Sequence, residues 1–244
     1  MKLLVHGRTE PGFNLACEEY FLTKTGLELD IFWRNSPVVV VGRNQDAFAE
    51  ASEDYLKANG IALVRRMTGG GAVYHDLGNI CYTHIRDYNG PVDFARFARP
   101  MVEALQRLGV PAEFAGRNDI LADGKKISGT AETVWKGRLL HHGTLLYDVR
   151  MEHLTGVLRV SEEKYAGRGI ASVAARVTNI RPLLPDAPDT EGFMARLTRE
   201  WPHSELYRLT REDTEEIEKI RAGVYENPGW TQHKKRERGA AFPA

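Results

Sequence analysis

One short stretch of the chain has the residue types of an anion-binding loop. Residues 65–76 read RRMTGGGAVYHD, so two arginines and a threonine precede three consecutive glycines. Glycine can adopt a positive φ and lets the backbone approach a ligand closely, with amide N–H groups facing an anion. A glycine run alone is more often a turn, but a turn needs none of these flanking residues. We therefore interpret the stretch as a loop that binds an acyl group and a nucleotide.

The spacing of this stretch excludes two common phosphate-binding motifs. No Gly-Lys-Ser/Thr follows the glycines, as a Walker loop requires, and three adjacent glycines do not match G-x-G-x-x-G. A phosphate bound here must therefore also be contacted by lysine or arginine from another part of the chain.

The loop and its surroundings resemble the signature of the lipoate-protein ligases. This family is related in fold to biotin-protein ligases and to lipoyl and octanoyl transferases. The resemblance continues, in family order, through FNLACEE at 13–19, WRN at 33–35, VVGRNQ at 40–45, GN at 78–79, RND at 117–119, KISGTA at 126–131, HHGTLL at 141–146 and RVTN at 176–179.

The resemblance implies an α+β fold with mixed β-sheets flanked by helices, like the class II synthetase-like catalytic domain of the biotin and lipoate ligases. We expect one domain over residues 1–244. Relatives with two domains begin a small carboxy-terminal accessory domain about where this chain stops at Ala244. The expectation is therefore that this accessory domain is absent, and that the activity is either shared with a separate small subunit or carried by a single-domain ligase or transferase.

The resemblance also implies a reaction with two half-steps. Lipoate attacks the α-phosphate of ATP to give lipoyl-AMP, and an acceptor lysine then takes the lipoyl group. The implied cofactors are ATP and Mg²⁺. The implied partners are lipoyl-domain proteins, such as the acyltransferase subunits of 2-oxo-acid dehydrogenases and the glycine cleavage H protein. Such an enzyme needs positioning, positive charge and exclusion of water rather than a covalent nucleophile.

Lys126 is the first candidate for a catalytic residue. By match to the family's Lys-x-Ser-Gly-x-Ala element it contacts the α-phosphate and the acyl carbonyl, and the small residues of the same element leave space for the ligand: Ser128, Gly129 and Ala131. Strand alternation directs Lys125 to the other face. Some relatives continue this element with an aromatic residue and an arginine, where this chain has Glu132 and Thr133.

The glycine loop supplies further candidates for ligand binding. Arg66 is assigned to phosphate or to the acyl carboxylate, and Thr68 either binds ligand or caps the turn. The three glycines form a wall for the acyl chain or the adenylate: Gly69, Gly70 and Gly71. His75 is included by resemblance, although a lone histidine at a strand end is more often structural.

Asn118 and Asp119 are a turn signal in isolation and an adenylate or metal contact in the context of the family. Asp119 is the better Mg²⁺ ligand, because Mg²⁺ prefers carboxylate and phosphate oxygens. A zinc site at His141 and His142 is rejected, because adjacent strand residues point to opposite faces and no further ligands complete a tetrahedral set.

The elements that must position these residues follow from hydrophobic periodicity. Helices are expected from Pro11 to Gly26, over 52–60, over 94–108 and after Thr210. Pro100 is expected to bend or restart the third of these helices. Residues 31–33 and 38–41 are expected to form a buried hairpin, and further strands are expected over 112–114, 126–131, 138–147 and 204–207. The proline-rich span 181–188 is a linker or a loop, and residues 233–238 form a charged tail.

Composition limits the function classes. The formal net charge is zero, so no global electrostatic argument favours nucleic acid or a membrane surface, and the amino terminus has no signal-like apolar segment. Two cysteines without metal-like spacing favour reduced thiols and a cytoplasmic location.

Two rival functions remain. An octanoyl or lipoyl amidotransferase of the same fold would need a reactive cysteine, whereas Cys81 and Cys17 are interpreted as buried thiols. A lipoate-binding subunit that is inactive without its partner is the second rival. Biotin-protein ligase is weaker, because its glycine loop has a different residue pattern.

Overall fold

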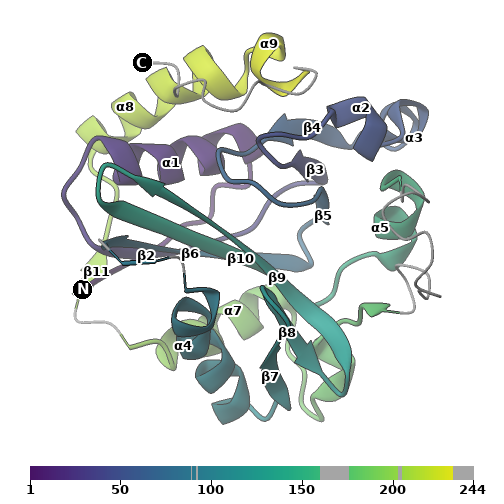
Figure 1. The fold of residues 1–244 in the computed structure, drawn as a ribbon. Coiled ribbons are helices and arrows are strands. Elements are labelled where there is room, and N and C mark those ends of the chain that lie inside the picture. Colours follow the sequence, from purple (N-terminus) through teal and green to yellow (C-terminus); the bar gives the residue numbers. More distant parts are fainter. Residues whose placement is uncertain (89, 92, 160–175, 203–204, 233–244) are drawn as a thin grey trace.

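Two β-sheets form the centre of the computed structural model, which describes residues 1–88, 90–91, 93–159, 176–202 and 205–232 (Figure 1). The larger sheet has the strand order β11-β1-β2-β6-β10-β9-β8-β7. Its strands are β1 (Lys2–Val5), β2 (Leu29–Trp33), β6 (Asn79–Asp87), β7 (Ala112–Ala115), β8 (Asp119–Ala122), β9 (Lys125–Trp135), β10 (Arg138–Leu146) and β11 (Glu205–Tyr207). The smaller sheet has the order β4-β3-β5 and consists of β3 (Val38–Val41), β4 (Ala62–Arg65) and β5 (Val73–His75).

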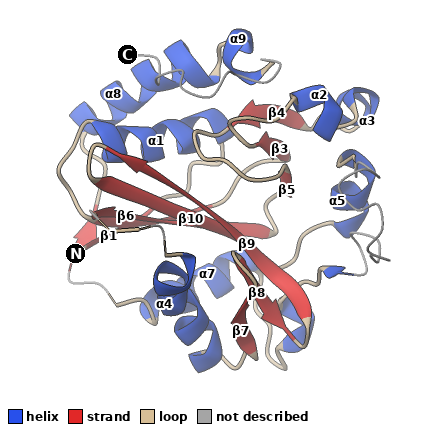
Figure 2. Ribbon diagram, viewed as in Figure 1, coloured by secondary structure: helices blue, strands red, loops and turns tan. Residues whose placement is uncertain are grey.

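Helices cover both faces of the larger sheet (Figures 1 and 2). On one side lie α1 (Pro11–Thr23), α8 (Arg211–Ile220), the π-helical turn η3 (Arg221–Tyr225) and α9 (Pro228–Thr231). On the other side lie α4 (Phe94–Arg107) and α7 (Thr190–Arg199). The short helices α2 (Ala47–Glu50), α3 (Glu53–Ala58) and α5 (Met151–Val157) lie beside the smaller sheet, and the 3-10 turn η2 (Arg181–Leu183) precedes α7. Parallel and antiparallel pairs occur in both sheets, which confirms the expected α+β architecture with mixed sheets.

Local sequence signals explain several helices. The apolar residues of α4 recur every three or four positions, and Ala98, Met101 and Leu105 are fully buried against the sheet. Pro100 lies inside the continuous helix, so the helix does not restart there. At α8, Thr210 and Asp213 form a complete capping box. At α3, Ser52 occupies the N-cap position, but its side chain makes no capping hydrogen bond.

One expectation about the strands is wrong, and one strand was not predicted. The runs at 31–33 and 38–41 do not form a hairpin, because β2 pairs with β1 and β6 in the larger sheet, whereas β3 pairs with β4 and β5 in the smaller one. The turn signal at Asn118 agrees with the structure, in which residues 116–118 form the turn between β7 and β8, but β8 itself was not predicted.

The proline-rich span lies within one packed unit. Ile180, before it, shares a hydrophobic cluster with Phe193 and Leu197 of α7 and with Met101 of α4, so the span connects elements that pack on the same core. The charged tail at 233–238 lies outside the described residues. Within the ranges that the structure describes, no helix is long and apolar enough to cross a membrane.

Candidate functional site

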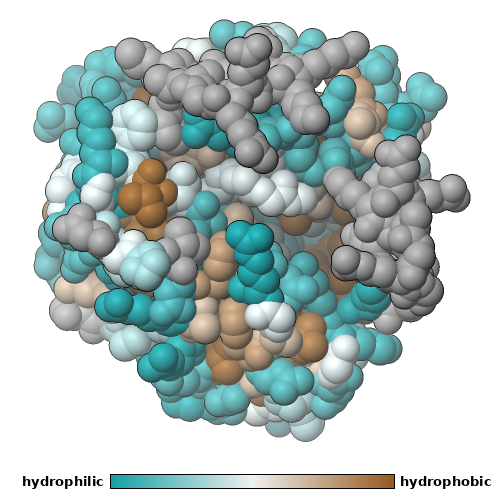
Figure 3. Space-filling model, in the orientation of Figure 1, coloured by the Kyte–Doolittle hydropathy of each residue, from teal (hydrophilic) through white to brown (hydrophobic). Residues whose placement is uncertain are grey.

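A cavity of about 960 Å³ opens between the two sheets. It is lined by residues from α1, from both sheets and from the glycine loop after β4. Figure 3 shows the surface hollowed near the middle of this face, with hydrophobic residues visible inside the hollow. The volume is at the upper end of the range of ~300–1,000 Å³ that is usual for small-molecule sites.

The glycine loop is shaped by Arg66. This side chain is buried, and its Nη2 donates to the carbonyl oxygens of Gly69 at 2.6 Å and Gly71 at 2.8 Å, while its Nη1 donates to Val40 at 3.1 Å. Gly70 has a φ of +93°, a conformation that favours glycine. Burial lowers the pKa of Arg66 to about 10, so the guanidinium remains charged at neutral pH. Most of its donors are thus directed at the loop itself.

A second glycine fits against this loop. A Cβ added to Gly42 would lie 2.2 Å from the carbonyl oxygen of Gly70, and the Arg43 amide donates to the Thr68 carbonyl at 2.8 Å. The backbone of the turn after β3 therefore packs directly against the backbone of the glycine loop. Any side chain at position 42 would push the two loops apart.

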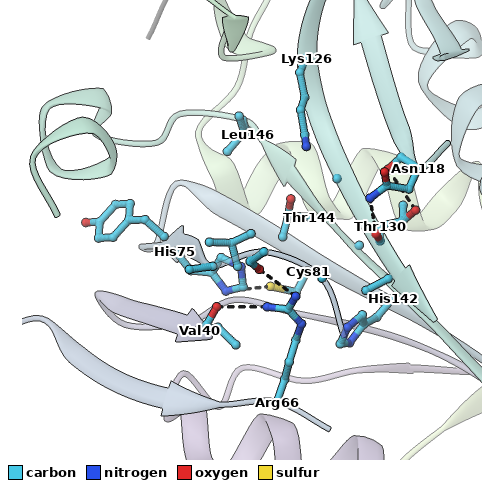
Figure 4. Close-up of a pocket in the computed structure, with 18 of the residues that line it drawn as sticks. Val40, Arg66, His75, Cys81, Asn118, Lys126, Thr130, His142, Thr144 and Leu146 are labelled. Atoms are coloured by element: carbon cyan, nitrogen blue, oxygen red, sulfur yellow. Dashed lines mark hydrogen bonds between the residues drawn. The ribbon is translucent and has the colours of Figure 1, made fainter. Parts of the chain in front are cut away.

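Lys126 lies on the opposite side of the cavity, near the start of β9 (Figure 4). Its Nζ is 2.7 Å from Asp119 Oδ1, and its carbonyl oxygen accepts the amide of Thr178 at 3.0 Å. Gly129 leaves room for the side chain, because a Cβ at Gly129 would lie 2.8 Å from Lys126 Nζ. The sequence assigned Lys126, Asp119 and Gly129 separately, and the structure brings all three together.

The glycine loop and strand β9, which carries Lys126, are close to each other. A Cβ added to Gly70 would lie 3.9 Å from the Cβ of Ala131 on β9. Gly70, Gly71 and Ala131 all line the cavity together with Lys126. A ligand in the cavity can therefore contact the loop on one side and the ammonium group on the other.

His75 and Cys81 form part of the cavity wall (Figure 4). The His75 Nδ1 accepts from the Asn35 amide at 3.0 Å, so the proton is on Nε2. Burial, with the nearby Arg66 and His142, lowers the pKa of His75 to about 3, and the ring is neutral. The Cys81 thiol lies 3.5 Å from the same Nδ1, and burial raises the pKa of Cys81 well above its usual range. A neutral thiol is a poor nucleophile.

The remaining sequence candidates differ in their placement. Asn118 lines the cavity, but its amide also donates to the Thr130 carbonyl at 2.8 Å. Thr68 and Ser128 are fully buried and are not among the residues that line the cavity. Gly69 contributes its carbonyl oxygen to the Arg66 contact and is also not among the lining residues.

Adjacent histidines on β10 face opposite sides of the sheet. His142 lines the cavity and its Nδ1 is 2.9 Å from Glu18 Oε1, whereas His141 Nδ1 is 2.6 Å from Glu132 Oε1 on the other face. His141 and His142 therefore point to opposite faces of the sheet, as the argument against a zinc site assumed. Within the described ranges, no group of three or more His, Cys, Asp or Glu side chains is arranged to hold a metal ion.

Sequence reasoning missed several polar residues of the cavity, among them Glu18 and His142. Both stand in segments that had been recognised, FNLACEE and HHGTLL, but neither had been assigned to the ligand site. Glu18 is 1% exposed in the folded chain, and a charged group is rarely buried unless it is paired. This burial marks Glu18 as a residue of interest, but the sequence alone does not show it.

Comparison with known proteins gives consistent matches. A family model described as the lipoyl protein ligase A/B catalytic domain matches residues 10–201. The chain is 40% identical over 231 residues to lipoate-protein ligase LplJ of Bacillus subtilis, and the match covers 91% of this chain and 70% of that protein.

Solved structures match in the same way. One chain from a study of a bipartite lipoate protein ligase and its E2 lipoyl domain, from Thermoplasma acidophilum, matches with a TM-score of 0.81 and 27% identity, covering 98% of both chains. A Thermoplasma acidophilum ligase structure with bound lipoic acid gives 0.79 and 27%, covering 95% and 98%. A lipoate-protein ligase A bound with ATP gives 0.78 and 26%, covering 96% and 98%.

Proposed function

Because the chain belongs to the family of lipoyl protein ligase A/B catalytic domains, we propose that it is an ATP-dependent lipoate-protein ligase. It activates lipoate to lipoyl-AMP and transfers the lipoyl group to a lysine of a lipoyl-domain protein. Relatives of similar fold hold lipoic acid in one case and ATP in another, which supports both substrates for this chain.

The observation that carries the proposal is the position of Lys126 across the cavity from the glycine loop (Figure 4). A mixed anhydride of lipoate and AMP has its negative charge at the phosphate and a polarised carbonyl beside it. An ammonium group at this point stabilises the charge that develops on both. The loop on the other side confines the ligand without adding side-chain bulk.

The first half-reaction forms a bond between a lipoate carboxylate oxygen and the α-phosphorus, and it breaks the bond from that phosphorus to the pyrophosphate leaving group. In the second, the acceptor amine attacks the lipoyl carbonyl, the amide bond forms and AMP leaves. In both steps we assign Lys126 to the oxygen that gains charge. The neutral His75 and Cys81 form part of the cavity wall and supply no nucleophile.

Mg²⁺ is assigned to the ATP phosphates, with Asp119 as its protein ligand. A single carboxylate fits this role, because Mg²⁺ in nucleotide sites is bound through one or two carboxylates plus phosphate oxygens and water. Asp119 lines the cavity, and its Oδ1 lies 2.7 Å from Lys126 Nζ. An ion held by Asp119 would supply positive charge that neutralises the ATP phosphates beside the Lys126 ammonium group.

The acceptor is assigned by relationship: the Thermoplasma ligase was studied with its E2 lipoyl domain. We propose a lipoyl-domain protein of this kind as the partner, and a small accessory subunit for the activation step. Both cysteines are free and buried, in keeping with a cytoplasmic enzyme.

The test uses the purified chain, with and without a candidate small accessory subunit, and separates the two half-reactions. Lipoate-dependent ATP–pyrophosphate exchange measures activation, and transfer from preformed lipoyl-AMP to a lipoyl domain, followed by mass spectrometry, measures the second step. Lys126→Ala is expected to slow both by at least ~100-fold. The matched control is Lys125→Ala, which removes the exposed neighbouring lysine and keeps wild-type rates.

Three outcomes would contradict the proposal. The chain could perform neither step, Lys126→Ala could retain both rates, or the chain could transfer octanoyl groups from an acyl-carrier thioester without ATP through Cys81. The last result would identify an amidotransferase.

A further inference from the structure

A chain of hydrogen bonds leads from the glycine loop to the buried Glu18 of α1. Arg66 Nε donates to Thr68 Oγ1 at 2.9 Å, and Thr68 Oγ1 lies 2.8 Å from His142 Nε2. The other ring nitrogen, His142 Nδ1, lies 2.9 Å from Glu18 Oε1. Four side chains from three separate segments are thus joined in series.

One arrangement of hydrogens joins every member of this series. The Thr68 hydroxyl accepts from Arg66 and donates its single hydrogen to a lone pair of His142 Nε2. The His142 proton is therefore on Nδ1 and is donated to Glu18. Thr83 also donates its hydroxyl to Glu18 Oε1, which fits an ionised carboxylate that can only accept.

The two ends of the series carry opposite buried charges. Arg66 is 5% exposed and Glu18 is 1% exposed, and the Glu18 charge favours the protonated guanidinium. Thr68 and His142 connect these charges. Removing a middle member would leave a buried donor or acceptor without a partner, which is costlier than losing the bond alone.

The conformation of the glycine loop depends on the orientation of the Arg66 side chain. The guanidinium holds the carbonyls of Gly69 and Gly71 on either side of Gly70, so the path of the loop depends on where Nη2 lies. The Nε contact with Thr68 fixes the guanidinium plane, and His142 fixes the hydroxyl of Thr68.

We propose that Thr68, His142 and Glu18 are positioning residues that hold the glycine loop in its ligand-binding shape through Arg66. The inference rests on the proposed ligase function and names which residues prepare the site for the lipoyl-adenylate. Thr68 gives the cleanest test, because it is fully buried and is not among the cavity-lining residues, so a substitution there removes no ligand contact.

The experiment compares Thr68→Val with Thr68→Ser. Valine keeps the shape of threonine and removes the hydroxyl, whereas serine keeps the hydroxyl. We expect Thr68→Val to raise the KM for lipoate in pyrophosphate exchange roughly tenfold and to lower kcat/KM by about 10–100-fold, and Thr68→Ser to stay within about threefold of wild type. A KM change cannot result from a smaller folded fraction.

The matched control is His141→Gln. His141 is also a buried histidine on β10 with a carboxylate at Nδ1, but it faces away from the cavity. Its loss is expected to lower the melting temperature and to leave the KM for lipoate unchanged, whereas His142→Gln raises that KM as Thr68→Val does.

Hydrogen–deuterium exchange gives a readout that does not depend on activity. Peptides covering residues 66–74 should exchange faster in Thr68→Val than in wild type, and at the wild-type rate in His141→Gln. A wild-type KM and wild-type exchange in Thr68→Val would overturn the proposal, as would an equal KM increase in His141→Gln. An inactive wild-type chain whose loop still loosens in Thr68→Val would refute the ligase function and leave the positioning role standing.

Discussion

Gly129→Ala should displace the Lys126 ammonium group without unfolding the protein. The added Cβ would lie 2.8 Å from Lys126 Nζ and 3.0 Å from its Cε. Ordinary van der Waals contact begins at 3.4 Å, so Nζ has to retreat by roughly 0.6 Å or more. The obstructing atoms are the far end of a flexible side chain, and Gly129 does not have a positive φ. The stability of the fold should therefore change little.

The effect on catalysis should be much larger than the effect on stability. A misplacement of about 1 Å at a reacting centre can cost on the order of 100-fold in rate. For a shift somewhat smaller than this we expect kcat for pyrophosphate exchange to fall about 10–100-fold, which corresponds to about 1.4–2.8 kcal/mol. The melting temperature should stay within ~2 °C of wild type.

The assay is lipoate-dependent pyrophosphate exchange together with thermal denaturation of the same preparations. Gly7→Ala is the control, because a Cβ there meets nothing within 4 Å. A Gly129→Ala variant with the wild-type kcat would refute the reasoning, because it would mean that the position of the Lys126 ammonium does not limit the reaction.

Three further predictions concern residues around the site. Arg65 donates to five backbone carbonyls, those of Trp230, Thr231, Gly42, Arg43 and Gln45. Arg65→Met should therefore lower the melting temperature by roughly 10 °C, whereas Arg211→Met on the exposed face of α8 should not change it. Equal melting temperatures for the two variants would contradict this prediction. Both ring nitrogens of His6 are buried and have no hydrogen-bond partner among the described residues, and burial, reinforced by Arg8, lowers the pKa of His6 to about 4. The folded state therefore loses stability as pH falls from ~6.5 toward ~4. His6→Leu should therefore gain about 2 kcal/mol relative to wild type between pH 7.5 and pH 5 in urea unfolding, and a pH-independent difference would be the contrary result. Gly42→Ala should separate the turn after β3 from the glycine loop and lower kcat/KM for lipoate at least ~10-fold. A Gly42→Ala variant with wild-type kinetics would contradict this prediction.

Sequence alone predicted the elements with strong local signals. The helical period of 94–108, the capping box at Thr210 and Asp213, and the strands at 126–131 and 138–147 all depend on neighbours in the chain. The structure extends the first of these strands to 125–135 and ends the second at Leu146. The hairpin at 31–41 was wrong for a related reason. Local signals show that two apolar runs form strands, but not which strands they pair with, and here β2 and β3 belong to different sheets.

The sequence named residues of one cavity but not the connections between them. Lys126, Gly70, Gly71 and Ala131 line the cavity, whereas Thr68, Gly69 and Ser128 are not among the lining residues. The partnership of Glu18 with His142 joins residues 124 positions apart and depends on the packing of α1 against β10. The Arg65 contacts with α9 span 165 positions. No local pattern encodes such pairs, so their roles became visible only in the folded chain.

The most direct test of the central claim is single-turnover transfer of the lipoyl group from preformed lipoyl-AMP to a lipoyl domain. The account predicts that the wild-type chain completes this transfer and that Lys126→Ala slows it at least ~100-fold while Lys125→Ala does not. Equal transfer rates for all three proteins would contradict the claim that an ammonium opposite the glycine loop drives the chemistry.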